Sequence, residues 1–391
     1  MPNKKRTIFT KILIWRYKYI SERQFILVLS VLVGFLAGLG TVLLKYLTLF
    51  IQSVLEGGFI RNYYYSLYFI FPIVGVWLVY LIKKNFLKKE IGHGISTTLY
   101  AISKRSGIIE RYKMFASLMV APITVGFGGS VGLQGPAVST GAAIGSNVAS
   151  MFHMNAKTRM LLIGCATAGA MSSMFKAPVA AIVFAVEIFS LDLVFTSLVP
   201  LLLASVAAVI TSYFFRGTDV LFSFELLDAW RVKDIVFYVF LGVATGIASV
   251  YFSKMYFLIT RFFAWFSNAY VKIGIAALAI GLMLYLFPPL YGEGYGLINN
   301  LLNGETEAAL NGIQYQIDFN NVWIVIAILL IIAVFKAIAM TTTFAAGGVG
   351  GIFIPTLFMG SALGNSVAKV INQFGFEVSE SNFTLIGMTG L

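Results

Sequence analysis

The chain has 391 residues, of which 59% are hydrophobic and 11% are charged. This composition excludes a water-soluble or disordered protein, because such a chain would expose far more apolar surface than proteins tolerate in water. The sequence therefore predicts a multi-pass membrane protein, in which the net charge of +12 belongs to loops facing the cytoplasm and not to a nucleic-acid-binding surface.

Residues 1–24 are predicted to form a basic cytoplasmic segment. They are rich in Lys and Arg but lack the apolar core and the small-residue cleavage site of a signal peptide. The N terminus is accordingly expected in the cytoplasm, and the chain in the plasma or inner membrane of the cell.

Apolar runs follow in chain order and predict an all-helical membrane fold. They lie at about 24–50, 66–83, 113–127, 135–151, 158–174, 177–190, 193–215, 234–264, 271–289, 322–346, 354–372 and 383–391. Several runs are shorter than the roughly 20 residues that span a bilayer, and Gly and Pro interrupt them. Short, broken and tilted helices that end inside a membrane are typical of a solute path, because their free backbone groups need a polar cavity or protein around them.

An internal repeat divides the chain. Segment 128–148 resembles segment 347–367 at an offset of 219, with a proline and two later glycines at matching positions. Upstream, the GHG of residues 92–94 has a counterpart in the GEG of residues 292–294. We predict two membrane repeats of inverted topology, 25–216 and 217–391, with the site at their interface.

The second repeat is expected to be incomplete. Residues 384–390 echo the run at 161–169, which in the first repeat continues into a further pair of apolar helices. We therefore expect final helices missing from the second repeat, as in a truncated chain.

The motifs GLQGP at 132–136 and GIFIP at 351–355 predict helix starts that bind an anion. Proline at the first helical position costs no hydrogen bond, and the preceding glycines let the backbone approach a ligand. The free N–H groups and the positive end of the helix dipole favour a negative charge. The alternative is that these glycines only allow close packing of helices.

These motifs, together with GHGIS at 92–96, resemble the anion-site signatures GSGIP, GREGP and GIFAP of the CLC chloride channel and transporter family. The resemblance extends from about residue 25 to residue 391 and implies a homodimer in which each subunit holds its own path for chloride or another small anion. It implies that the following residues line the path: Gly92, His93, Gly94, Ile95, Ser96, Gln134, Gly135, Pro136, Gly351, Ile352, Phe353, Ile354 and Pro355.

Two positions depart from the proton-coupled members of that family. Gln134 replaces the glutamate of the second motif, and Ile188 replaces the glutamate that takes protons from the inner side. An amide carries no charge to compete with chloride and has no accessible protonation, although its NH2 group can donate to an anion. Gln134 could instead face lipid or protein outside the path. Glu187 matches a family acid that is assigned to structure, and we expect it to be paired.

Other positions leave two interpretations open. His93 replaces a serine and either offers an N–H to the anion or caps its helix, and Ser96 replaces a proline and would supply a capping hydroxyl. Lys176 and Lys336 lie in or beside apolar runs. They either attract the anion or, as we expect, snorkel to the membrane interface.

The sequence thus predicts passive conduction of chloride or another anion by a CLC-type channel that is not coupled to protons. An H+/Cl− or fluoride antiporter of the same family is the alternative. An enzyme is not expected, because the chain's two histidines, His93 and His153, are far apart and neither has a carboxylate at ligand spacing. No cofactor or metal is predicted, and chloride is the substrate.

Overall fold

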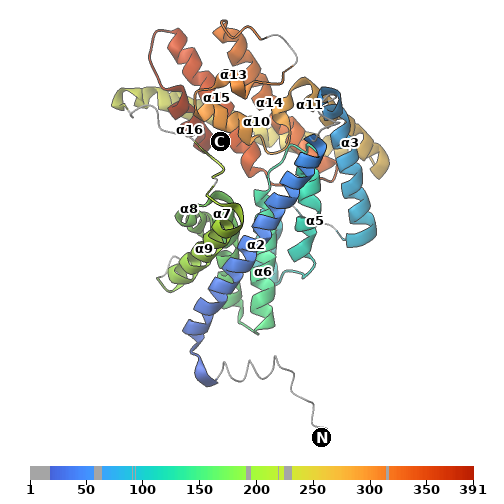
Figure 1. Ribbon diagram of the computed structural model, residues 1–391, viewed down its shortest axis with the longest axis vertical. Helices are drawn as coiled ribbons and strands as arrows, with labels where there is room; N and C mark the ends of the chain where they lie inside the picture. Colours follow the sequence, from blue (N-terminus) through green and yellow to red (C-terminus); the bar gives the residue numbers. More distant parts are fainter. Residues whose placement is uncertain are drawn as a thin grey trace. The chain divides into compact units, whose positions relative to one another are not determined.

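The computed structural model describes residues 18–56, 64–89, 91–92, 94–190, 195–218, 220–223, 231–313 and 317–391 (Figure 1). Its α-helices are α2 (Glu22–Glu56), α3 (Tyr64–Ile82), α4 (Gly94–Arg105), α5 (Lys113–Gly126), α6 (Gln134–Met151), α7 (Ala156–Phe175), α8 (Pro178–Phe189), α9 (Phe195–Arg216), α10 (Ile235–Ala264), α11 (Ala269–Leu286), α12 (Tyr295–Leu302), α13 (Thr306–Ala309), α14 (Val322–Ala345), α15 (Phe353–Gln373) and α16 (Glu380–Gly390). A π-helical turn, Lys83–Leu87, extends α3, and 3-10 turns lie at Val232–Asp234 and Pro288–Leu290. The described chain is therefore all-helical, as predicted.

Six helical stretches in the described part of the chain are long and apolar enough to cross a membrane. They are Glu22–Leu55, Phe69–Leu87, Ser197–Arg216, Val232–Ala264, Ala269–Leu286 and Val322–Ala345. The shorter apolar helices α5 and α8 are two of the four short segments that the sequence predicts, and the other two, α6 and α7, have 18 and 20 residues. The chain is a multi-pass membrane protein.

Hydropathy locates the long helices well but misses the polar ones. Each predicted apolar run corresponds to a helix whose ends lie within a few residues of it, apart from α2, which continues to Glu56. Helix α12 was not predicted as an element, because its eight residues are too few to form an apolar run. Helix α4, inferred only from its GHGIS motif, is polar and buries only Gly94, Thr98 and Ala101.

The described residues pack as two compact units. One unit contains residues up to Leu44 with Ile91–Leu118 and Pro136–Asp219, and the other contains Lys45–Glu90, Met119–Gly135 and Val220–Leu391. The packing units thus cut across the predicted repeats, and the division into 25–216 and 217–391 stays a prediction.

Helix α7 forms the core of the first unit. It packs against α8 and α9, and nearly all of its residues from Leu162 to Met174 are small or apolar and buried. Serine and threonine hydroxyls bond carbonyls across the helices: Ser172 donates to Ser205 O at 2.9 Å, and Ser173 to Gly38 O at 3.2 Å. Small residues and interhelical hydrogen bonds are what hold helices together inside a membrane.

In the second unit α14 and α15 pack against each other. Helices α10 and α11 contact α14, and α12 and α16 contact α15. The apolar helix α14 carries Lys336, which has no solvent exposure. A fully buried lysine in such a helix is costly, so its environment is of functional interest.

Repeat-related glycines make equivalent contacts, each within its own unit. A Cβ on Gly145 of α6 would lie 2.4 Å from Leu162 O of α7, and one on Gly364 of α15 would lie 2.1 Å from Phe383 O of α16. These glycines serve close helix packing, which is the alternative that the sequence left open for the motif glycines. The motif glycines Gly135 and Gly351 also lie against each other, so close packing applies at the helix starts as well.

The prolines of the motifs lie at the third helical position, not at the first as predicted. Helix α6 begins at Gln134, two residues before Pro136, and α15 begins at Phe353, two residues before Pro355. The correction has a simple reason: the first four N–H groups of a helix have no partner within it, so a proline is tolerated at any of these positions.

Candidate functional site

Two repeat-related glycine loops meet within the second unit. Gly132 N donates to Gly351 O at 3.0 Å, and Gly351 N donates to Gly132 O at 2.7 Å. A Cβ on Gly351 would lie 2.6 Å from the backbone nitrogen of Gly135, a distance that only glycine can accommodate. The starts of α6 and α15 are therefore held together by backbone contacts that the two sequence motifs supply.

Hydroxyl groups fix the two loops to the surrounding helices. Ser130 Oγ donates to Leu290 O at 2.7 Å, and Thr343 Oγ1 of α14 accepts from Ser130 N at 3.3 Å. On the other loop, Val349 N donates to Thr124 Oγ1 at 3.1 Å. Every one of these groups is buried, so the loops are rigidly positioned.

Gln134 is the first residue of α6 and is 1% exposed. Its Nε2 donates to the hydroxyl of Tyr295, at the start of α12, at 2.6 Å, while its Oε1 has no hydrogen-bond partner. Rotation of the amide by 180° would let the Tyr295 hydroxyl donate to Oε1 and would leave the NH2 group in the unpaired position. In that orientation Gln134 offers donors to an anion at the start of α6.

A buried ion pair lies beside Gln134. Lys45 of α2 donates from Nζ to Glu293 Oε2 at 2.6 Å, and the two side chains are 9% and 6% exposed. The other carboxylate oxygen, Oε1, accepts from the backbone N–H of Leu133 at 3.0 Å. Glu293 thus occupies a backbone donor of the residue that immediately precedes α6.

Two glycines in the left-handed region place Glu293. Gly292 has a φ of +58° and Gly294 a φ of +87°. These conformations are rare for residues with a side chain, so the GEG sequence is required for this sharp turn before α12. The turn directs the single side chain between the two glycines toward the start of α6.

Lys336 of α14 is the second buried cation in this region. Its Nζ donates to Gly292 O at 3.0 Å and to Leu290 O at 3.4 Å, and it lies 4.6 Å from the centre of the Phe358 ring. The prediction that Lys336 snorkels to an interface is wrong, because backbone carbonyls and an aromatic ring replace water around its ammonium group.

These groups place one buried ion pair, a second buried lysine and the positive end of a helix dipole in the second unit. Lys45, Glu293 and Tyr295 also line a cavity of about 620 Å³. A small anion reaching this cavity would meet the ammonium group of Lys45, whose ion-pair partner Glu293 binds the residue before α6.

The remaining residues of the second and third motifs differ in exposure. Gly135, Pro136, Gly351, Ile354 and Pro355 are buried. In contrast, Ile352 is 47% exposed and Phe353 is partly buried. The structure thus brings residues 132–135 and 351–355 together, as the repeat predicts.

The first motif belongs to the other unit and is described by itself. Helix α4 begins at Gly94, the third residue of GHGIS, just as α6 and α15 begin at the third residue of their motifs. His93 lies outside the described residues. Ile95 packs against the core cluster of the first unit, and Ser96 is an exposed residue of the first turn. Ser96 lies inside the helix, so it is not the capping residue that the sequence predicts.

The positions on α8 are also in the first unit. Ile188 packs against the apolar core cluster that includes Ala181 and Phe189. Glu187 is exposed, and within the described chain its carboxylate has no ion pair, in contrast to the predicted structural pairing. Lys176 caps α7 and donates from Nζ to Gly217 O at 2.5 Å, while it lies 4.9 Å from the Tyr213 ring centre.

Sequence reasoning missed the roles of Lys45, Glu293 and Tyr295. Lys45 lies 248 residues from Glu293, and no local pattern indicates that they meet. The sequence GEG at 292–294, which repeats the GHG at 92–94, could have indicated the role of Glu293, because this carboxylate occupies the position that matches His93. A lysine inside the apolar run of α2 was a second signal, because such a charge needs a partner.

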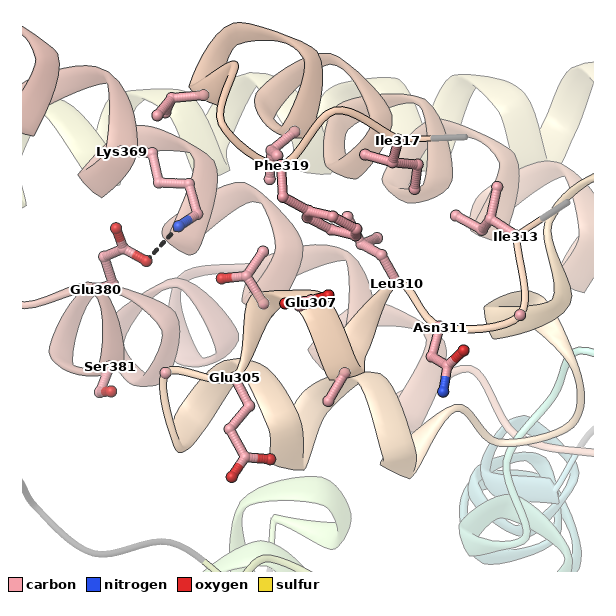
Figure 2. Close-up of a pocket in the computed structure, with 16 residues that line it drawn as sticks. Glu305, Glu307, Leu310, Asn311, Ile313, Ile317, Phe319, Lys369, Glu380 and Ser381 are labelled. Atoms are coloured by element: carbon pink, nitrogen blue, oxygen red, sulfur yellow. Dashed lines mark hydrogen bonds and ion pairs between the residues drawn. The ribbon is translucent and has the colours of Figure 1, made fainter. Parts of the chain in front are cut away.

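A larger pocket, of about 1100 Å³, lies elsewhere in the described part of the second unit. Figure 2 shows that Glu305, Glu307 and Glu380 gather around it, with Lys369 paired to Glu380. Its acidic lining is unsuited to an anion, so its size does not make it the candidate site.

Comparisons with known proteins agree with the membrane fold and with the motifs. The family described as voltage gated chloride channel matches residues 74–391. The H(+)/Cl(-) exchange transporter ClcA of Vibrio cholerae is 25% identical over 390 residues, which cover 94% of this chain and 78% of that protein. The voltage-gated ClC-type chloride channel ClcB of Escherichia coli is 25% identical over 283 residues, 71% of this chain but only 62% of that protein.

Solved structures show the same fold. The structure of a CLC-type fluoride/proton antiporter superposes with a TM-score of 0.70 at 22% identity, covering 93% of this chain and 84% of that chain. At this identity the likeness concerns the architecture of the helices.

Proposed function

Because the chain belongs to the voltage gated chloride channel family, we propose that it conducts chloride or another small anion passively through the membrane, without coupling to protons. The anion passes the starts of α6 and α15, where backbone N–H groups, the Gln134 amide and the positive ends of the helix dipoles attract it. Two copies of the chain form a homodimer, and each subunit has its own anion path.

The observation that carries the uncoupled mechanism is the buried amide at position 134. Gln134 lies at the start of α6 with an unpaired polar atom, yet it has no proton to exchange at physiological pH. Ile188, whose hydrocarbon side chain cannot carry a proton, packs in an apolar cluster. The two positions at which proton carriers are expected in the family's antiporters are therefore chemically inert toward protons.

An H+-coupled antiporter of chloride or fluoride is the second candidate. It is favoured by the names of the Vibrio relative, an H(+)/Cl(-) exchanger, and of the fluoride/proton antiporter with the same fold. The Escherichia coli relative, named a channel, favours passive conduction. Similarity alone does not choose between them, so the choice rests on Gln134 and Ile188.

Flux measurements on the full chain in proteoliposomes test the proposal. With an outward chloride gradient and the membrane potential clamped by K+ and valinomycin, we expect chloride efflux at a rate that is independent of the proton gradient. Fluoride and nitrate replace chloride in parallel runs to give the selectivity. Uphill proton movement driven by the chloride gradient would show that the chain is an antiporter.

A further inference from the structure

The Glu293 carboxylate is positioned as an anion would be positioned in the proposed path, on which this inference rests. Its Oε1 accepts from the N–H of Leu133, one residue before α6, at 3.0 Å. Gln134, the next residue, is the proposed contact of the permeating anion. A carboxylate and a chloride ion compete for the same donors, since both are monovalent anions that accept hydrogen bonds.

The ion pair with Lys45 is poorly explained by stability alone. Removing two charges from water costs several kcal/mol per ion, and a well-packed apolar pair is often at least as stable. This pair lies next to the Gln134–Tyr295 hydrogen bond, and Lys45 Nζ is 4.7 Å from the centre of the Tyr295 ring. The position of the ion pair, beside the start of α6, therefore points to a role other than stability.

Glu293 has a second partner, Lys45, and it lines a cavity. Its Oε2 is held by Lys45 at 2.6 Å, and both side chains line the cavity of about 620 Å³. Lys336 Nζ donates at 3.0 Å to the carbonyl of Gly292, the residue before Glu293. If Oε1 leaves Leu133, the carboxylate therefore remains bound to Lys45.

We propose that Glu293 is a tethered competitor of the permeating anion: it occupies the Leu133 amide in the empty site, and an anion binds by displacing it toward Lys45. Glu293 is thus a gating carboxylate supplied by the turn before α12, and Lys45 is the positioning residue that receives it. An anion that displaces Glu293 gains the Leu133 donor while the carboxylate keeps its ion pair.

Three substitutions separate displacement from a structural role. Glu293→Gln keeps the size of the side chain and removes its charge. Glu293→Asp keeps the charge but shortens the reach to the Leu133 N–H. Lys45→Gln removes the cation that receives the displaced carboxylate. Glu380→Gln breaks a matched pair, Lys369 to Glu380 at 2.5 Å, and serves as the control.

The measurement is chloride binding to the purified full chain by isothermal titration calorimetry. We expect both Glu293 variants to lower the half-saturating chloride concentration by about tenfold, because glutamine lacks the competing charge and aspartate cannot reach the Leu133 N–H. We expect Lys45→Gln to raise it by about tenfold, because the displaced carboxylate then lacks its counter-charge. Glu380→Gln should bind as the wild type does.

Two results would overturn the proposal. Wild-type chloride affinity in Glu293→Asp would mean that occupation of the Leu133 amide by the carboxylate does not affect anion binding. A change of the half-saturating chloride concentration in the same direction in Glu293→Gln and Lys45→Gln would indicate a purely structural ion pair. If neither Glu293 variant folds, Lys45→Gln decides, since an unchanged or lowered half-saturation contradicts the proposal. Uphill proton movement in liposomes would overturn only the uncoupled function. Unchanged half-saturating chloride concentrations in the variants, together with uncoupled chloride flux, would overturn only the role of Glu293.

Discussion

At the scale of single residues, the proposed site combines few side chains with many backbone donors. Gln134 donates to Tyr295, Glu293 binds Lys45 and the Leu133 N–H, and Lys336 binds two carbonyls. All of these groups are within the second unit. Buried charges of this kind are stable only because each has a partner.

Gln134→Glu is expected to slow chloride flux by about tenfold or more at neutral pH, because a second carboxylate would compete with the anion at the start of α6. The flux should recover as the pH falls toward the ordinary pKa of a glutamate, about 4.3, where the carboxyl becomes neutral. Proteoliposome efflux at a series of pH values measures both effects. Gln134→Ala is the control for loss of the amide, and unchanged flux in Gln134→Glu would place this side chain outside the path.

At the scale of elements, the starts of α6 and α15 are joined by glycine contacts. Their loops exchange two backbone hydrogen bonds between Gly132 and Gly351, and Gly135 lies against Gly351. The helices that carry the donors thus depend on each other for their positions. A displacement of one start would move the donors of both.

We expect Gly351→Ala to reduce anion flux and to destabilise the fold by about 1 to 3 kcal/mol, as overpacking does. Its Cβ would lie 2.6 Å from Gly135 N, so that the two helix starts must separate. Flux and the thermal unfolding midpoint in detergent are the two measurements. Gly274→Ala in α11, where a Cβ meets no atom within 4 Å, is the matched control. Equal behaviour of the two variants would contradict the close approach.

At the scale of the whole molecule, the distribution of charges along the chain predicts the orientation of this membrane protein. Basic residues are concentrated in the first 24 positions, which predicts a cytoplasmic N terminus. The sequence contains one cysteine, Cys165, and it is buried in α7. The wild-type chain therefore provides a low background for labelling of an introduced thiol.

We expect Asn3→Cys to react with a membrane-impermeant maleimide only after the cells are permeabilised, since the positive-inside rule places this segment in the cytoplasm. The wild-type chain, with Cys165 alone, is the control for background labelling. Labelling of Asn3→Cys in intact cells at the permeabilised level would reverse the predicted orientation.

The sequence by itself determined the membrane class, the ranges of the long helices and the motifs at which α6 and α15 start. These properties depend on the residues of each segment: apolar content sets a span, and Gly and Pro mark a helix start. Even so, the sequence placed the motif prolines two positions too early in their helices, because a proline is tolerated throughout the first turn.

Only the tertiary structure decided which charges meet. Lys45 and Glu293 are 248 residues apart, and Gln134 and Tyr295 are 161 residues apart. The sequence favoured an interface for Lys336, because hydropathy cannot show that the carbonyls of Leu290 and Gly292 surround it. A buried charge depends on partners from distant segments, and those partners are brought together only when the helices pack.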